Sequence, residues 1–216
     1  MQNQNIVLYS YFRSSTSWRV RIALNLKKIQ YEIKPINLLQ SEQKSEYFTK
    51  INPNQAVPAL EYKGQIIIES SAILDFLEEE FPDSYNLLPK DNLQRANIRG
   101  FCQIINSSIH PLQNLRVIQY VECQYKQDKI EWLKHWVNKG FQVLEQILKE
   151  NKGLYCFGDQ ISLADIYFIP QVQGVVDRFQ FDLSPFPNIK EVYENLKNIQ
   201  EFIDASPAKQ IDNLNK

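Results

Sequence analysis

The chain has 216 residues, of which 44% are hydrophobic and 23% charged, and its formal net charge is −1. This length and composition predict a globular protein of one or two domains and exclude wholesale disorder. Lys and Arg number 24 against 25 Asp and Glu, so the sequence lacks the basic excess typical of nucleic-acid-binding proteins. No apolar run approaches the ~18 residues of a membrane span, and the first residues lack a signal-peptide pattern. We therefore expect a cytoplasmic protein that binds neither nucleic acid nor membrane.

The cysteines, histidines and glycines narrow the possible chemistry. Cys102, Cys123 and Cys156 are odd in number and widely spaced, which favours a reducing compartment over a disulfide framework. The two histidines, His110 and His135, have no ligand residues close by in sequence, so we expect no metal site. The six glycines form neither a dinucleotide-binding motif nor a P-loop, which argues against a nucleotide-phosphate site.

The first 84 residues alternate short apolar runs with segments of helical spacing. Apolar or alternating runs predict strands, and Lys63-Gly64 between two of them is a hairpin signal. Apolar residues three or four apart predict helices. In chain order we expect a strand at 6–10, a helix at 14–28, a strand at 31–36, a short helix at 44–50, strands at 59–62 and 65–68, and a helix at 70–81. This order predicts a thioredoxin-like α/β domain over residues 1–84.

The segment 82–89 contains two prolines and breaks this pattern, so we interpret it as a linker. Strand signals almost vanish beyond it. Apolar residues at helical spacing predict helices over 93–121, 133–148, 163–176 and 189–199. We therefore expect an all-α domain over residues 90–216.

The turn between the first strand and the first helix carries the strongest functional signal. Positions 14–17 are four consecutive hydroxyl residues, and no acidic residue precedes Glu32. Free amides and the helix dipole favour an anion at such a helix start, and a hydroxyl there can donate a hydrogen bond to a thiolate. The same residues also suit a simple N-cap, so both interpretations stay open. A thioredoxin-type redox role is less favoured because the turn lacks Cys-x-x-Cys.

Two further segments of this domain place polar groups at the ends of elements. Val57-Pro58 precedes a strand; a cis bond would turn the Val57 backbone outward to an extended peptide ligand, whereas the alternative is an ordinary trans proline. Glu69 and Ser70 open the helix at 70–81. We expect Ser70 to cap this helix and to help hold a carboxylate, and Glu69 to be able to hold an ammonium group.

Taken together, these segments resemble the zeta-class glutathione transferases, the maleylacetoacetate isomerases. The resemblance runs from about residue 6 to about residue 207. It rests on Ser-Ser-Thr-Ser-Trp-Arg-Val-Arg-Ile-Ala-Leu at 14–24, Val-Pro at 57–58, Glu-Ser-x-Ala-Ile at 69–73, Pro-Leu-Gln-Asn-Leu-Arg at 111–116 and Tyr-Cys-Phe-Gly-Asp-Gln-Ile-Ser-Leu-Ala-Asp at 155–165. The chain departs from the family pattern at Thr16, where the family usually has Cys, and at Glu69, where members often have Gln.

The resemblance implies the glutathione-transferase fold, in which a thioredoxin-like α/β domain precedes an all-α helical bundle. It implies glutathione as the cofactor, with Ser14 as the hydroxyl that stabilises the glutathione thiolate and Ser15 beside it in the catalytic turn. The other implied glutathione-binding residues are Thr16, Val57, Glu69, Ser70 and Gln113. The implied substrate-binding residues are Arg13 and Arg178.

The implied activity is the glutathione-dependent cis–trans isomerisation of maleylacetoacetate to fumarylacetoacetate, a step of phenylalanine and tyrosine catabolism. The reaction needs neither a metal nor a protein nucleophile, which agrees with the scarcity of His and Cys. One alternative is a general zeta-type transferase that conjugates glutathione to small electrophiles; another is a non-catalytic interaction module of the same fold. We also expect a homodimer, because the family pairs and because four apolar residues exceed what one buried stripe needs: Phe101, Ile104, Ile105 and Ile109.

Overall fold

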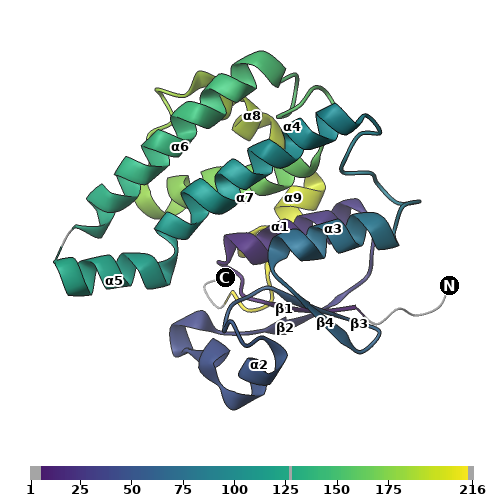
Figure 1. Ribbon diagram of the computed structural model, residues 1–216, viewed down its shortest axis with the longest axis vertical. Helices are drawn as coiled ribbons and strands as arrows, with labels where there is room; N and C mark the ends of the chain where they lie inside the picture. Colours follow the sequence, from purple (N-terminus) through teal and green to yellow (C-terminus); the bar gives the residue numbers. More distant parts are fainter. Residues whose placement is uncertain (1–5, 127, 214–216) are drawn as a thin grey trace. The chain divides into compact units, whose positions relative to one another are not determined.

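The structure is a computed structural model that describes residues 6–126 and 128–213 (Figure 1). It divides into an α/β unit, Met1–Asn86 with Ile199–Lys216, and a helical unit, Leu87–Asn198. The predicted sequence of a thioredoxin-like α/β layer followed by helices is thus found. Within the described ranges, no helix is long and apolar enough to cross a membrane.

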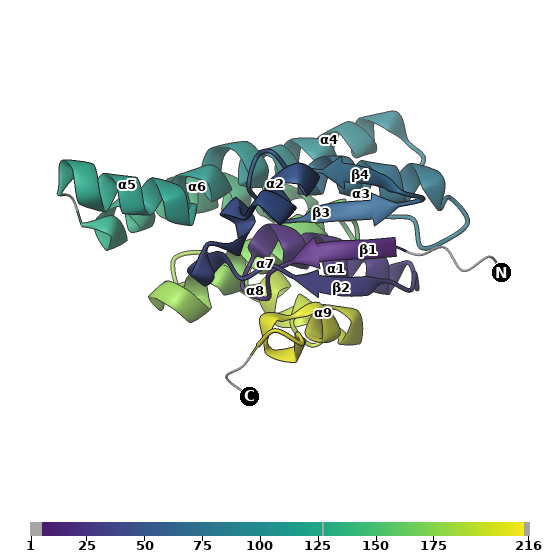
Figure 2. The same cartoon turned by 90° about the horizontal axis from the view of Figure 1, so that it is seen from below.

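A four-stranded sheet forms the centre of the α/β unit, with the strand order β2-β1-β3-β4 (Figure 2). The strands are β1 (Ile6–Ser10), β2 (Glu32–Pro35), β3 (Ala59–Tyr62) and β4 (Gln65–Ile68). β1 pairs parallel with β2 and antiparallel with β3, and β3 pairs antiparallel with β4. Since β1 is buried along its whole length, its continuous apolar run is typical of a central strand.

Helices cover both faces of this sheet. α1 (Ser15–Leu26) and α3 (Ser70–Glu80) lie side by side on one face, and α2 (Glu46–Ile51) lies on the other (Figure 1). Alternate residues of β1, Val7 and Tyr9, join the cluster that Phe48 of α2 completes. This arrangement places the N-terminus of α1 directly after the end of β1.

Lys27, just after α1, binds the segment that follows α3. Its side chain is fully buried, and its Nζ lies 2.8 Å from Glu78 Oε2. The same ammonium group donates to Ser84 Oγ at 3.2 Å and to the carbonyl of Tyr85 at 2.9 Å. The first residues of the expected linker at 82–89 are therefore held in place by hydrogen bonds from Lys27.

The C-terminal residues differ from the sequence prediction, which placed everything from residue 90 to 216 in the helical domain. Residues 199–213 pack with the α/β unit instead, and a helix that the sequence did not indicate, α9 (Gln200–Ala205), lies beside α1 (Figure 2). Both apolar burial and hydrogen bonds hold this segment in place. Phe202 and Ala205 of α9 are buried. Arg21 Nε donates to the carbonyl of Ala205 at 2.9 Å, and Asn25 Nδ2 donates to the carbonyl of Glu201 at 3.1 Å.

The helical unit contains the remaining long helices. They are α4 (Asn92–Gln103), α5 (Leu115–Tyr125), α6 (Lys129–Asn151), α7 (Leu163–Phe179) and α8 (Pro187–Leu196). The predicted helix at 93–121 is interrupted, because a π-helical segment, Ile104–Ile109, and a 3-10 turn, His110–Gln113, separate α4 from α5. Pro111 cannot donate a helical hydrogen bond, and the Asn114 side chain caps the next helix through the amide of Arg116.

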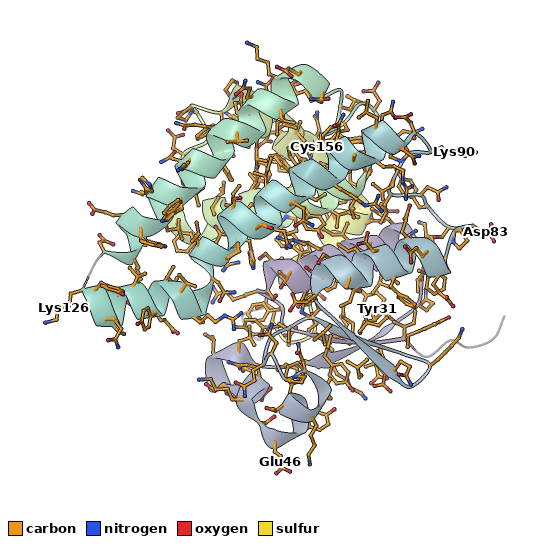
Figure 3. All side chains as sticks on the ribbon, viewed as in Figure 1. Tyr31, Glu46, Asp83, Lys90, Lys126 and Cys156 are labelled. Atoms are coloured by element: carbon orange, nitrogen blue, oxygen red, sulfur yellow. The ribbon has the colours of Figure 1, made fainter. Side chains whose placement is uncertain are left out.

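A buried carboxylate fixes the start of α7. Asp165 accepts from the amide of Cys156 at 2.8 Å, from the amide of Ser162 at 2.7 Å and from Ser162 Oγ at 3.0 Å, so Ser162 and Asp165 form a capping box. Burial raises the pKa of Asp165, and these donors oppose that shift. Cys156 lies inside the helical unit (Figure 3), and burial raises the pKa of its thiol well above the usual value. Cys102 is also buried, whereas Cys123 is exposed.

The apolar residues offered as a sign of dimerisation are used within the chain itself. Phe101, Ile105 and Ile109 are no more than 1% exposed, and Ile104 is half-buried. The helical unit therefore uses them for its own core, so these residues do not indicate dimerisation.

Candidate active site

The hydroxyl-rich turn lies at the N-terminus of α1, as predicted. Ser14 is the N-cap residue, and its Oγ accepts from the amide of Ser17 at 3.2 Å. The amide of Ser14 in turn donates to the carbonyl of Tyr11 at 2.9 Å, which closes the turn that follows β1. Capping is thus one established role of Ser14, and it fixes where the hydroxyl lies. Ser15, the first residue of α1, is buried.

The hydroxyl of Ser14 belongs to a directed chain of hydrogen bonds. Ser14 Oγ lies 2.9 Å from Thr16 Oγ1, and Thr16 Oγ1 donates to the carbonyl of Val57 at 3.0 Å. A hydroxyl carries only one proton, and Thr16 donates its proton to the carbonyl of Val57. The bond between the two hydroxyls is therefore donated by Ser14, and Ser14 keeps a donor that can be turned to another acceptor.

The segment around Val57 reaches this turn from the sheet side. The Val57–Pro58 peptide bond is cis, which the sequence left open. The preceding loop is ordered by Asn52, whose Nδ2 donates to the carbonyl of Ala56 at 2.6 Å and whose Oδ1 accepts from the amide of Asn54 at 3.0 Å. Thr16 and Val57, 41 residues apart in sequence, are thereby joined in one site.

The N-terminus of α3 supplies a second polar cluster. The sequence predicted Ser70 as its N-cap, but Glu69, with φ at 71°, occupies that position and Ser70 begins the helix. The carboxylate of Glu69 accepts from Asn54 Nδ2 at 3.0 Å. The buried Ser70 Oγ accepts from Nη1 of Arg19, a fully buried side chain of α1, at 3.4 Å. An acceptor bond from a guanidinium leaves the Ser70 proton available for an anion.

Charge around the α1 turn favours an anion. The first turn of α1 contains no acidic residue. Arg13 is exposed, and its guanidinium lies 5.7 Å from the centre of the Phe12 ring. Together with the helix dipole and the free amides, these features suit a bound anion at this turn.

The remaining predicted site residues, Gln113 and Arg178, belong to the helical unit. Gln113 exchanges two hydrogen bonds with the buried Gln171: its Nε2 donates to Gln171 Oε1 at 2.9 Å, and its Oε1 accepts from Gln171 Nε2 at 3.1 Å. Arg178 is exposed in the last turn of α7.

Both halves of the chain match family models: residues 4–79 match "Glutathione S-transferase, N-terminal domain" and residues 112–205 match "Glutathione S-transferase, C-terminal domain". A maleylacetoacetate isomerase of Dictyostelium discoideum is 46% identical over 98% of both chains, and that of Mus musculus is 44% identical over 98% of this chain and 97% of the relative. The chain belongs to the zeta-class glutathione transferases. This confirms the family expected from the motifs at 14–24, 57–58 and 69–73.

Solved structures of zeta-class proteins have the same fold as this chain. A bacterial maleyl pyruvate isomerase of the zeta class, in its holo form, superimposes with a TM-score of 0.91 at 39% identity, over 95% of this chain and 99% of that one. A maleylacetoacetate isomerase of Anaeromyxobacter dehalogenans, with bound dicarboxyethyl glutathione and citrate in the active site, gives a TM-score of 0.87 at 35% identity, over 98% and 99%.

The site of this zeta-class chain contains polar residues that its sequence motifs did not single out. Asn52 and Asn54 belong to none of these motifs, yet they order the Val57 loop and bind Glu69. Arg19 lies within the motif at 14–24, but its contact with Ser70 depends on the packing of α1 against α3. One feature of the sequence indicates such a partner for Arg19: this residue lies among apolar residues, and no acidic residue is close to it in sequence. A buried arginine needs polar partners.

Proposed function

We propose that the chain catalyses the glutathione-dependent cis–trans isomerisation of maleylacetoacetate to fumarylacetoacetate and that it does so in the cytoplasm. The names of its relatives, maleylacetoacetate isomerases, support the reaction. The observation that carries the proposal is the Ser14 hydroxyl at the α1 N-terminus, whose proton points into a hydroxyl chain and not to a fixed backbone acceptor. Because the first turn of α1 contains no acidic residue of its own, its free amides suit a thiolate.

The residues of the α/β unit fit glutathione. Ser14 and Ser15 would face the sulfur, with Thr16 shaping the turn. The carbonyl of Val57 is engaged by Thr16, so its amide is the group that we assign to the cysteinyl part of the tripeptide. At α3, the Ser70 hydroxyl and helix amides would hold the γ-glutamyl carboxylate, and the Glu69 carboxylate would hold its ammonium group. In the helical unit, Gln113 is assigned a supporting contact.

When bound, glutathione would supply a thiolate able to add reversibly to the activated cis double bond, so that rotation becomes possible while this bond is single and elimination of the thiolate gives the trans product. Ser14 and the N-terminal amides of α1 stabilise negative charge on the sulfur before addition and after elimination. Arg13 and Arg178, both exposed, are the cations that we assign to substrate carboxylates. The solved relative with dicarboxyethyl glutathione and citrate, and another with malonate and GSH, support a dicarboxylate substrate.

The test is retention on immobilised glutathione followed by an isomerase assay with maleylacetoacetate. We expect both retention and glutathione-dependent turnover. Retention with conjugation of small electrophiles but no isomerisation would favour a general zeta-type transferase. Neither retention nor turnover in a folded protein would contradict the proposal and favour an interaction module.

The Thr16 position tests whether the family's cysteine is needed for this chemistry. We expect Thr16→Cys to make the enzyme sensitive to thiol-alkylating reagents while the isomerase rate stays within about threefold, because a thiol is only a weak hydrogen-bond partner and glutathione provides the nucleophile. Inactivation kinetics with iodoacetamide measure the sensitivity, and Thr16→Ser, which keeps the hydroxyl chain, is the control. A gain in rate of about a hundredfold would show that a thiol at this position is catalytic.

We also propose that the protein is a homodimer with one active site per subunit. Apolar side chains remain exposed in both units, among them Leu93 of α4 at 71% and Ile66 of β4 at 39%. Light scattering at micromolar concentration is expected to give twice the chain mass of 25.4 kDa. A mass equal to that of one chain would contradict this proposal.

A further inference from the structure

The backbone of Tyr11 and Phe12, which leads into Ser14, is held from two directions. On one side is Arg21, a fully buried residue of α1. Its Nη2 donates to the carbonyl of Phe12 at 3.1 Å and its Nη1 to that of Tyr11 at 3.4 Å. Nη1 also donates to Ser10 Oγ at 2.9 Å. One guanidinium therefore binds both the end of β1 and the start of the turn that leads to Ser14.

The second support comes from the far end of the chain. Asp212 Oδ2 accepts from the amide of Phe12 at 2.9 Å, across 200 residues of sequence. The amide and the carbonyl of Phe12 are thus both engaged by side chains, one by Asp212 and the other by Arg21. Such charge-assisted bonds are about twice as strong as neutral ones.

The two supports also act on one another. Burial lowers the pKa of Arg21 to about 10, while the charges of Tyr31 and Asp212 oppose that shift. The guanidinium is therefore protonated near neutral pH. Arg21 further bonds the carbonyl of Ala205, so the segment that carries Asp212 is anchored to the same side chain.

We propose that Asp212 and Arg21 are positioning residues that clamp the Phe12 peptide and so fix the Ser14 hydroxyl at the place where it meets the glutathione thiolate. This rests on the proposed function, since Ser14 needs exact placement only if it acts on the sulfur. The consequence is that the C-terminal segment contributes to catalysis without touching the substrate. A displacement of about 1 Å at a reacting group can cost about a hundredfold in rate, so a partial loosening of the turn is a measurable effect.

The test removes the Asp212 support, because loss of the buried Arg21 would threaten the fold. In Asp212→Ala we expect amide hydrogen exchange in the peptide covering residues 11–17 of the glutathione-free protein to accelerate. In the glutathione complex, the pH midpoint of thiolate formation, followed by ultraviolet absorbance, should be higher in Asp212→Ala than in Asp212→Asn, because both variants remove the Asp212 charge and only the first removes the acceptor of the Phe12 amide. The value of kcat should fall about 3- to 10-fold while KM for glutathione changes by less than about twofold.

Two variants in the same segment serve as controls. Asp212→Asn keeps an oxygen that accepts from the Phe12 amide, so we expect it to restore the exchange protection and most of kcat. Ile211→Ala changes a neighbouring side chain that is 66% exposed, and we expect no change in any readout. If Asp212→Ala lowers only the denaturation temperature, leaves exchange and kcat unchanged and has the same thiolate midpoint as Asp212→Asn, the inference is overturned. A wild-type protein that binds no glutathione would instead refute the proposed function, and exchange in the free protein would still decide whether Asp212 orders the turn.

Discussion

Replacing Ser14 by Ala is expected to lower the isomerase rate by about 10- to 150-fold, the equivalent of one charge-assisted hydrogen bond worth about 1.5–3 kcal/mol. The physical reason is the loss of the donor to the thiolate at the α1 N-terminus. The pH midpoint of thiolate formation in the glutathione complex should rise at the same time, because the anion loses stabilisation. Steady-state kinetics and ultraviolet titration measure the two effects.

The structure offers a matched control for the second role of Ser14. Ser45 caps α2 with the same geometry, since its Oγ accepts from the amide of Phe48 at 3.2 Å, as Ser14 Oγ accepts from Ser17. Both Ser14→Ala and Ser45→Ala should lose about 1 kcal/mol of unfolding free energy, but only the first should lose activity. Unchanged turnover in Ser14→Ala, with Ser15→Ala inactive, would transfer the catalytic role to Ser15.

Asp165→Ala is expected to destabilise the helical unit by about 3–5 kcal/mol, because it leaves two buried amides and one hydroxyl without their acceptor. In a chain of this size each kcal/mol shifts Tm by about 2–4 °C, so thermal denaturation should move down by about 6–20 °C. Calorimetry or circular dichroism measures the shift.

Two comparisons separate this network from a general effect of removing a charge from α7. Asp165→Asn keeps one carbonyl oxygen but sets an amino group against the remaining donors, so an intermediate loss is expected. Asp177→Ala removes an exposed carboxylate from the same helix and should change Tm little. Equal effects of Asp165→Ala and Asp177→Ala would contradict the role of the capping network.

Local signals predicted most of the α/β unit. The run at 6–10 and the hairpin at 59–68 have the same bounds in the sequence prediction and in the structure, because strand patterning and the Lys63-Gly64 turn act over a few residues. The sequence prediction did not place a break between α4 and α5, although Pro111 lies there, because the apolar spacing continues on both sides of this proline. Periodicity alone does not register a π-helical segment.

The candidate site shows the same division between local and distant information. Ser14, Val57 and Glu69 could be singled out because each stands at the end of an element, where function often concentrates. Asn54 and Asp212 could not, because an asparagine in a polar turn and an aspartate near a chain end have no distinguishing local pattern. Their roles depend on contacts with Glu69 and with Phe12, 15 and 200 residues away.

The packing of residues 199–213 with the α/β unit bears on how the protein is made. The unit that holds Ser14 is assembled from both ends of the chain, with all of Leu87–Asn198 synthesised between them. At about 5–20 residues per second, a ribosome needs on the order of ten seconds to add that stretch. During this time the nascent α/β layer has no α9 to cover α1, and Arg21 has not met the carbonyl of Ala205. Completion of the turn that carries Ser14 therefore waits for the synthesis of residues 199–213, because until then α1 lacks its α9 neighbour and the Phe12 amide lacks the Asp212 acceptor.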